Sequence, residues 1–252
     1  MNKRPIGIID INVEGLYILN SLTKEFKNED FIYINDIKNY PYEGREREEI
    51  VKFVTSNVEK LLEQNIKMLV VISDTIIEYC LDYLQTLNIP VINIVQSIIS
   101  FVNKNYEQKN LALLAKSYIL KANLYQKNFN YNHMYNIASE ELENIIALNK
   151  TKTSKSFKTT FELFKNSPKK EYNLLIITAP WMELVKTEIL EYLEVDEFIK
   201  LGNVLTDDIK KVNTEIYNRG KGKITVLSNV EKKEFVELTK WFTLKYKYIQ
   251  MV

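Results

Sequence analysis

The chain has 252 residues and a formal net charge of +1, from 34 lysines and arginines against 33 aspartates and glutamates. This length is enough for one large domain or two small ones, and the balanced charge gives no overall field that favours nucleic acid or an anionic membrane. One cysteine and one histidine exclude an internal disulfide and the usual zinc site. No segment approaches the roughly 20 apolar residues that span a bilayer, and the start lacks the pattern of a secretion signal. We therefore expect a cytoplasmic protein without a membrane or metal partner.

Short apolar runs rich in β-branched residues alternate with longer segments of helical period. This alternation is typical of α/β proteins with mainly parallel sheets flanked by helices, and eight strands are enough for two sheets. The lysine-rich segment 148–158 is predicted to be a mobile connection rather than a nucleic-acid site. In chain order, the predicted strands cover residues 5–10, 31–36, 67–72, 90–94, 110–115, 172–178, 196–201 and 223–228, and the predicted helices cover 45–65, 75–87, 117–128, 138–149, 181–193, 204–218 and 231–242.

Polar residues follow several of the predicted strands. Asp10, Asp36, Ser73 and Thr178 each stand where a strand ends and a loop begins. Ligands of parallel sheets bind at the carboxyl ends of the strands, so these four positions are the candidate ligand contacts. Two or three neighbouring carboxylates can attract a cation such as Mg²⁺, or they can only cap helices and turns.

Three long stretches carry a resemblance to a known family. They are RPIGIIDINVEGLYIL (4–19), NEDFIYINDIKNYPYEGREREEI (28–50) and KMLVVISDTIIEYCLDYL (67–84), and weaker likeness continues through YNLLIITAPWMELVKTEI (172–189) and KITVLSNVEKKEFVELTKWF (223–242). In order and spacing these segments resemble glutamate racemases, of the aspartate/glutamate racemase superfamily. The resemblance implies a cofactor-independent protein with two pseudo-symmetric α/β lobes, residues 1–95 with 204–252 and residues 96–203, that face each other across a cleft.

The resemblance also implies a chemistry, and the residues depart from it. The family inverts the α-carbon of glutamate with two cysteines, one from each lobe, because inversion through a planar carbanion needs a base on one side and an acid on the other. Ser73 stands where the first thiol is expected, and Ala179 stands where the second is expected. Trp181 replaces the assisting histidine, whereas Asp10 is retained. By position, the ligand contacts that the resemblance implies are Asp10, Asn12, Asp36, Pro41, Tyr42, Ser73, Asp74 and Thr75.

We interpret the chain as a catalytically inactive homologue, a pseudoenzyme that acts as a binding, regulatory or scaffolding protein. Such a protein would keep a vestigial small-molecule cleft and bind an unknown protein partner, an active paralogue or a second copy of itself. The alternative is an enzyme with residual or altered activity that uses Ser73 and an acidic cluster of Asp10, Asp36 and Asp74. Cys80, seven residues beyond Ser73, is predicted to be a buried and inert thiol. His133 is predicted to be a surface or packing residue.

Overall fold

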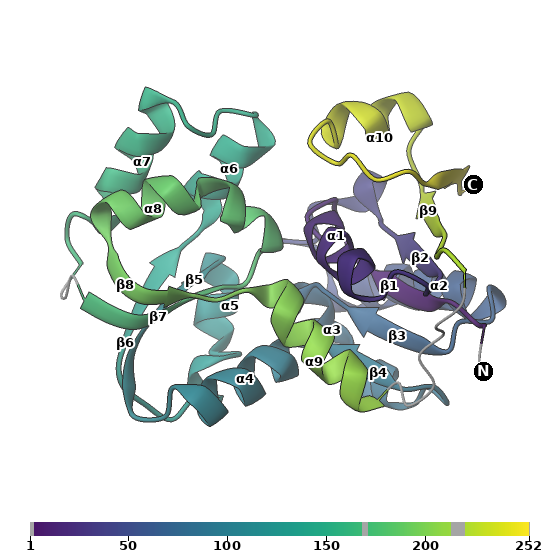
Figure 1. Ribbon diagram of the computed structural model, residues 1–252, viewed down its shortest axis with the longest axis horizontal. Coiled ribbons are helices and arrows are strands. Elements are labelled where there is room, and N and C mark those ends of the chain that lie inside the picture. The colour runs from purple at the N-terminus through teal and green to yellow at the C-terminus, as the bar shows by residue number, and fades with distance from the viewer. Residues whose placement is uncertain (1–2, 168–170, 213–219, 252) are drawn as a thin grey trace. The chain divides into compact units, whose positions relative to one another are not determined.

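The computed structural model describes residues 3–167, 171–212 and 220–251. Within them the chain forms two compact units (Figure 1). Unit 1 consists of Met1–Ser97 and Leu201–Val252, and unit 2 consists of Ile98–Lys200. Helix α4 (Ile94–Asn105) contains the first boundary, and helix α9 (Leu201–Val212) begins at the second.

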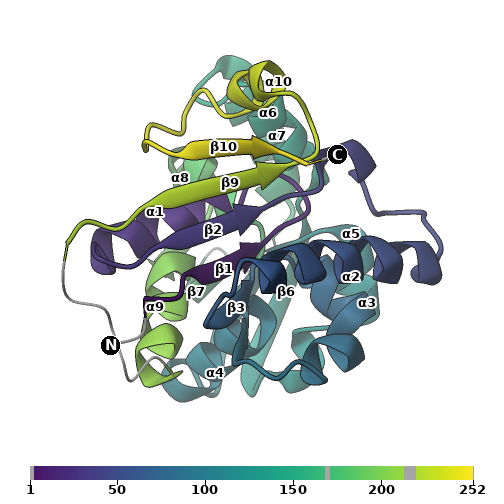
Figure 2. The same cartoon turned by 90° about the vertical axis from the view of Figure 1, so that its right-hand side faces the viewer.

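Unit 1 is built on a parallel sheet of six strands in the order β10-β9-β2-β1-β3-β4. In Figure 2 the arrows of β10, β9, β2 and β1 run side by side in one direction. Strands β1, β2 and β3 are four-residue runs of buried, mostly β-branched side chains, which is typical of strands that are covered on both faces. The strands are β1 (Ile6–Ile9), β2 (Phe31–Ile34), β3 (Met68–Val71), β4 (Val91–Asn93), β9 (Ile224–Ser228) and β10 (Lys247–Gln250).

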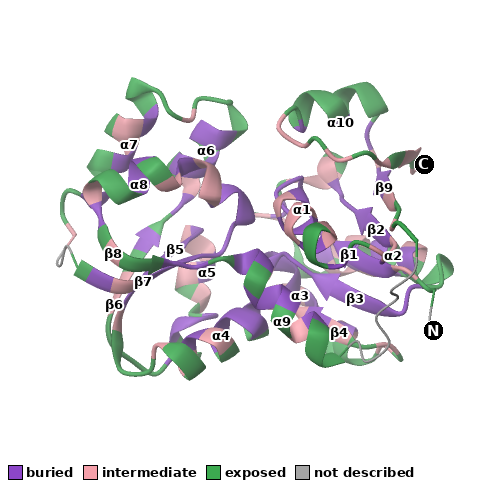
Figure 3. Cartoon of the chain, in the orientation of Figure 1, coloured by how far each residue is buried: buried purple, intermediate pink, exposed green. Residues whose placement is uncertain are grey.

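Amphipathic helices cover this sheet. Helix α2 buries Ile50, Val54, Val58 and Leu61, which recur at helical spacing, and it exposes its charged side. Helices α1 and α9 pack together, and Gly202 is required there because a Cβ would lie 2.5 Å from the Cβ of Ser21. Figure 3 shows the buried sheet and the largely exposed helix α10. Besides α4 and α9, the helical segments of unit 1 are α1 (Leu16–Glu25), η1 (Ile37–Asn39), α2 (Arg47–Glu63), α3 (Asp74–Gln85) and α10 (Lys232–Leu238).

Unit 2 has a parallel sheet of four strands in the order β6-β5-β7-β8. This order repeats that of β2-β1-β3-β4 in unit 1, with the first strand of each set in second place. The strands are β5 (Lys109–Ala115), β6 (Tyr131–Ala138), β7 (Glu171–Ile177) and β8 (Glu194–Phe198). The helices are α5 (Ser117–Ala122), η2 (Gln126–Asn128), α6 (Glu140–Ala147), α7 (Ser154–Phe164), η3 (Pro180–Val185) and α8 (Lys186–Tyr192).

The predicted fold class is confirmed, since both sheets are parallel and flanked by helices. Several individual predictions were wrong. The sequence reasoning missed strands β6 and β10 and helices α1, α4 and α7, and it extended β8 to Leu201, which begins α9. The segment 148–158 is not simply a loop, because the side chain of Thr153 accepts a hydrogen bond from the N–H of Ser156 and starts α7. Residues 213–218 of the predicted helix 204–218 lie outside the described residues. None of the helices in the described part of the chain is long and apolar enough to cross a membrane.

Candidate functional site

The carboxylate of Asp10 lies at the end of β1 and is engaged on both oxygens. Oδ1 accepts hydrogen bonds from the N–H groups of Ile11 at 2.7 Å and Asn12 at 3.4 Å, and Oδ2 accepts from Gly15 N–H at 2.7 Å and from the Tyr33 hydroxyl at 2.6 Å. The same hydroxyl lies 3.0 Å from the carbonyl oxygen of Asn12. Burial, and then the negative charge of Asp10, raises the pKa of Tyr33 well above its usual value. Asp10 therefore fixes the turn that leads from β1 into α1.

The carboxylate of Asp36, after β2, is engaged in a similar way. Oδ2 accepts a hydrogen bond from the Tyr42 hydroxyl at 2.6 Å, and Oδ1 accepts from the side-chain amides of Asn39, at 2.9 Å, and Asn229. Asp36 and Tyr42 are 2% and 1% exposed. Burial, followed by the charge of Asp36, raises the pKa of Tyr42. Because Asn229 follows β9, Asp36 ties together two loops at the carboxyl edge of the sheet.

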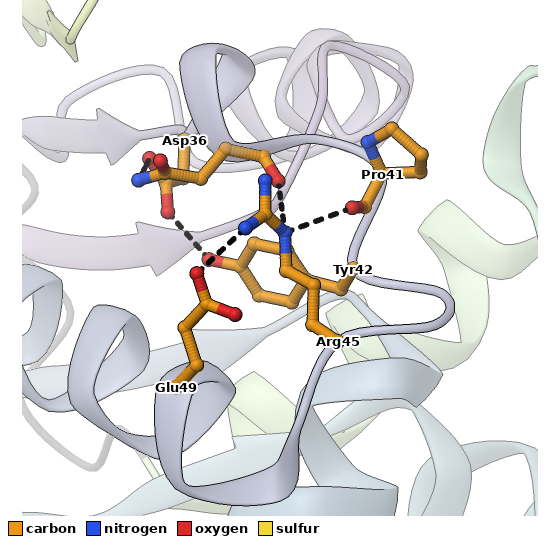
Figure 4. Close-up of polar contacts among 6 residues, drawn as sticks. Asp36, Pro41, Tyr42, Arg45 and Glu49 are labelled. Atoms are coloured by element: carbon orange, nitrogen blue, oxygen red, sulfur yellow. Dashed lines mark hydrogen bonds and ion pairs between the residues drawn. The ribbon is translucent and has the colours of Figure 1, made fainter.

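An arginine holds the loop that contains Pro41 (Figure 4). Nε of Arg45 donates to the carbonyl oxygens of Asn39 at 3.1 Å and Pro41 at 3.2 Å, and its guanidinium forms an ion pair of 2.7 Å with Glu49. Pro41 itself is exposed. The loop between β2 and α2 is therefore held in place by contacts within unit 1, without a ligand.

Ser73 is the N-cap of α3. Its backbone is extended, with φ −106° and ψ 122°, and its side-chain oxygen accepts a hydrogen bond from the N–H of Ile76 at 3.4 Å. This contact satisfies one of the N–H groups left unpaired at a helix start, as the sequence indicated. Asp74 is half-buried and Thr75 is buried, both in the first turn.

The three acidic residues at this edge do not form a metal site. Strand β1 lies between β2 and β3, so Asp10, Asp36 and Asp74 follow neighbouring strands. Among the described residues, however, no three His, Cys, Asp or Glu side chains are grouped so that they could hold a metal ion. The structure therefore gives no support to the Mg²⁺ site that the sequence left open.

Unit 2 carries a different set of groups at its strand ends. Thr178, Ala179 and Trp181 follow β7 and are 4%, 7% and 5% exposed. The Trp181 indole nitrogen is buried and makes no hydrogen bond with any described residue. Burial raises the pKa of Glu183 in the same turn, although the positive charges of Lys186 and Lys200 lower it.

Sequence reasoning missed a buried polar network next to β5 and β6. Lys116 follows β5, and its Nζ lies 3.7 Å from Glu143, with side chains 11% and 7% exposed. Ser139 follows β6, and its hydroxyl donates to the other oxygen of Glu143 at 2.5 Å. These positions obey the same rule as Asp10 and Asp36, that polar residues directly after a strand lie at the carboxyl edge. That rule could have identified Lys116, because the strand before it was predicted. It could not have identified Ser139, because β6 was not recognised.

The remaining candidate groups lie away from the strand ends. Cys80 is in the middle of α3 and is 2% exposed, and burial raises the pKa of its thiol to about 11, although Arg47 lowers it. The thiol is therefore protonated at neutral pH and is a poor nucleophile. His133 is exposed on β6, which agrees with the predicted surface position.

Comparison with known proteins adds independent information. No model of a protein family matches the chain. A glutamate racemase of Staphylococcus epidermidis is 36% identical over 143 residues, which cover 55% of this chain and about half, 53%, of that protein. A glutamate racemase of Clostridium botulinum is 25% identical over 252 residues and covers 94% of this chain and 96% of that protein. The crystal structure of glutamate racemase from Thermus thermophilus, in complex with β-chloro-D-alanine, superposes with a TM-score of 0.88 at 18% identity, covering 99% of this chain and 97% of that one.

The chain is therefore similar in sequence to glutamate racemases. The structural likeness at 18% identity shows that it has the fold of these proteins. Several of the predicted ligand contacts form hydrogen bonds within the chain. Asp10, Asn12, Asp36, Tyr42 and Ser73 all take part in hydrogen bonds at the carboxyl edge of the unit 1 sheet.

Proposed function

We propose that this chain is a glutamate racemase homologue that does not racemise amino acids and acts as a binding, regulatory or scaffolding protein. The observation that carries the proposal is the state of its only thiol. Cys80 is buried within α3 and its pKa is raised to about 11, whereas the end of β3 carries Ser73, whose oxygen caps the helix. A cysteine base must form its thiolate near neutral pH, and Cys80 does not meet this requirement.

The chemistry of inversion supports the same proposal. An alcohol is a base only if a partner removes its proton, and among the described residues no histidine or carboxylate forms a hydrogen bond with the Ser73 hydroxyl. At the matching position of unit 2, the Ala179 side chain has no proton to exchange. A two-base mechanism needs an acid and a base, and these two positions supply neither.

The enzyme alternative depends on the acidic residues. Asp10 accepts four hydrogen bonds and Asp36 accepts three, all from groups within unit 1. Both oxygens of each carboxylate are therefore already engaged by groups of the fold. This argues against a general base at either position. Lys116 and Glu143 in unit 2 are further buried titratable groups that are available to an altered activity.

A racemisation assay tests the proposal. L-Glutamate and D-glutamate are incubated separately with the purified chain, and formation of the other enantiomer is followed by chiral chromatography. The Staphylococcus epidermidis glutamate racemase serves as the active control, and Ser73→Ala serves as the matched inactive variant. We expect no conversion above the Ser73→Ala sample. Conversion that disappears in Ser73→Ala would overturn the proposal.

The scaffolding role has a separate test. A catalytically inactive homologue that serves as a subunit should co-purify with its partner from the native host, and an active paralogue is one such partner. Recovery of the chain alone, as a monomer, from a lysate at physiological salt would contradict the subunit role.

A further inference from the structure

A pocket of about 690 Å³ lies in unit 1 at the amino edge of the sheet. It is formed by three segments, each of which leads into a strand: the end of α1 and the loop before β2 (residues 23–29), residues 220–224 before and at the start of β9, and residues 243–245 before β10. These strands are parallel neighbours (Figure 2), so the pocket lies at the opposite edge of the sheet from Asp10 and Asp36. Its volume falls within the range of about 300–1,000 Å³ that is usual for small-molecule sites.

The wall of the pocket is held by backbone contacts. Gly222 N–H donates to the carbonyl oxygen of Lys27 at 2.9 Å, and Lys223 N–H donates to the Asp30 carboxylate at 2.7 Å. Gly222 is required at this place, because a Cβ would lie 2.1 Å from the carbonyl oxygen of Glu29. The segments 23–29 and 220–224 are therefore fixed against each other, and the pocket between them is preformed.

The lining of the pocket carries more positive than negative charge. Four lysines line the pocket, and none of them forms an ion pair within the described parts of the chain: Lys24, Lys27, Lys221 and Lys245. The single acidic lining residue, Glu29, is paired with Lys67 at 2.7 Å, and this pair is 2% and 4% exposed. Lys24 lies in the last turn of α1, where the partial negative charge of the helix end offsets part of its own. The other three lysines leave the opening with uncompensated positive charge.

The rest of the lining is largely apolar, with Phe26, Ile224 and Leu244 beside Thr23 and Thr243. Apolar walls favour an apolar group by removing it from water, and lysines around the opening favour a negative charge. We propose that this pocket binds a small organic anion that carries an apolar group, such as a phosphate monoester or a carboxylate. The site is separate from the carboxyl edge, so this inference is independent of whether the chain racemises glutamate.

Selective ¹⁵N labelling of glycine tests the proposal sharply, because the chain has only 6 glycines. Gly220 and Gly222 line the pocket, whereas Gly15 and Gly44 belong to loops after β1 and β2. Phenyl phosphate is the probe. Inorganic phosphate and phenol, which correspond to the two halves of this molecule, are tested separately at the same concentration. We expect phenyl phosphate to shift the Gly220 and Gly222 amide signals saturably, and each half to bind at least tenfold more weakly.

Variants identify the residues that bind. Lys27→Gln with Lys221→Gln should weaken phenyl phosphate about tenfold, roughly threefold for each charge removed near an exposed anion. The matched control is Lys104→Gln with Lys127→Gln, two exposed lysines of unit 2, which should leave the affinity unchanged. The signals of the other four glycines show that each variant is folded.

Three results would overturn the proposal. The first is the absence of a saturable shift at Gly220 and Gly222. The second is equal binding of inorganic phosphate, which would remove any role for the apolar lining. The third is an unchanged affinity in the Lys27 and Lys221 variant, or shifts confined to Gly15 and Gly44, either of which would locate binding elsewhere.

Discussion

Replacing Asp10 with asparagine should destabilise unit 1, because the carboxylate is held by four donors. The side-chain amide of asparagine has one accepting oxygen and one donating nitrogen. If the nitrogen takes the place of Oδ1, it opposes Ile11 N–H at 2.7 Å, and if it takes the place of Oδ2, it opposes Gly15 N–H at 2.7 Å. Both orientations set two donors against each other in a site that is 1% exposed.

The less costly orientation gives the size of the effect. With the nitrogen in the place of Oδ2, Tyr33 can turn its hydroxyl proton toward the Asn12 carbonyl, which lies 3.0 Å away, and can accept from the new amide. Gly15 N–H then remains buried without an acceptor, and one hydrogen bond to a charged group is lost. The expected loss in the free energy of unfolding is about 2–4 kcal/mol. At about 2–4 °C per kcal/mol, the midpoint of unit 1 should fall by roughly 5–15 °C.

The two tryptophans provide the assay, because Trp241 belongs to unit 1 and Trp181 belongs to unit 2. In a Trp181→Phe background, urea unfolding followed by fluorescence reports on Trp241, which packs near Tyr17 with ring centroids 5.9 Å apart. Asp82→Asn is the matched control, since the Asp82 side chain is 93% exposed, and it should change stability by less than about 0.5 kcal/mol. An Asp10→Asn variant as stable as this control would refute the structural role of Asp10.

Three further predictions concern side chains of unit 1. Ser73→Ala should cost about 1 kcal/mol in urea unfolding, because Ile76 N–H loses its acceptor, and an unchanged midpoint would contradict the cap. Cys80 should react slowly with iodoacetamide at pH 8 and faster toward pH 11. Its contribution to the free energy of unfolding should fall over about pH 9–11, because the thiol of the unfolded chain ionises at lower pH than the buried thiol. Rapid alkylation of the folded chain at pH 8 would refute the raised pKa. Lys67→Met should cost about 3–5 kcal/mol because the buried Glu29 carboxylate loses its ion pair with Lys67, and adding Glu29→Met should recover most of the loss. Additive losses in this double-mutant cycle would contradict a coupled pair.

The sequence predicted every interior strand of the two described sheets, but it missed two of the four edge strands. Strands β1, β2 and β3 are continuous apolar runs because both faces of the sheet are covered, and these runs were recognised. Strands β6 and β10 lie at the edges of their sheets. Their side chains are mostly exposed or half-buried, and in β6 only Ile137 is buried. Neither strand is a continuous apolar run like those of the interior strands, and both were missed for this reason.

The sequence contains a signal for helix α7, but the prediction gave more weight to the lysines of this segment. Its lysines suggested a solvated loop, although Thr153 and Ser156 form a capping box and Phe157, Phe161 and Phe164 recur at helical spacing. The charged residues occupy the exposed side of an amphipathic helix. The composition of this segment therefore led to the wrong prediction, whereas the spacing of its apolar residues would have predicted the helix.

The sequence predicted where the residues of the candidate site lie, but not which groups they form hydrogen bonds with. Strand ends identified Asp10, Asp36 and Ser73, because parallel strands bring their carboxyl ends to one edge. The hydrogen-bond partners of the two carboxylates were not predicted. Tyr33 lies inside a strand, and Asn229 is 193 residues from Asp36 in sequence. Such contacts depend on the strand order of the folded sheet, which the sequence alone did not provide.

The most direct test of the central claim is exchange of the glutamate α-proton with solvent. Exchange requires only one competent base, so it detects partial chemistry that racemisation would miss. Each enantiomer of glutamate is incubated with the chain in deuterated water, and the α-proton signal is followed by ¹H NMR against the Ser73→Ala variant. We predict that both enantiomers keep their α-protons at the rate of the protein-free sample. Loss of the α-proton from either enantiomer, faster than with Ser73→Ala, would contradict the account.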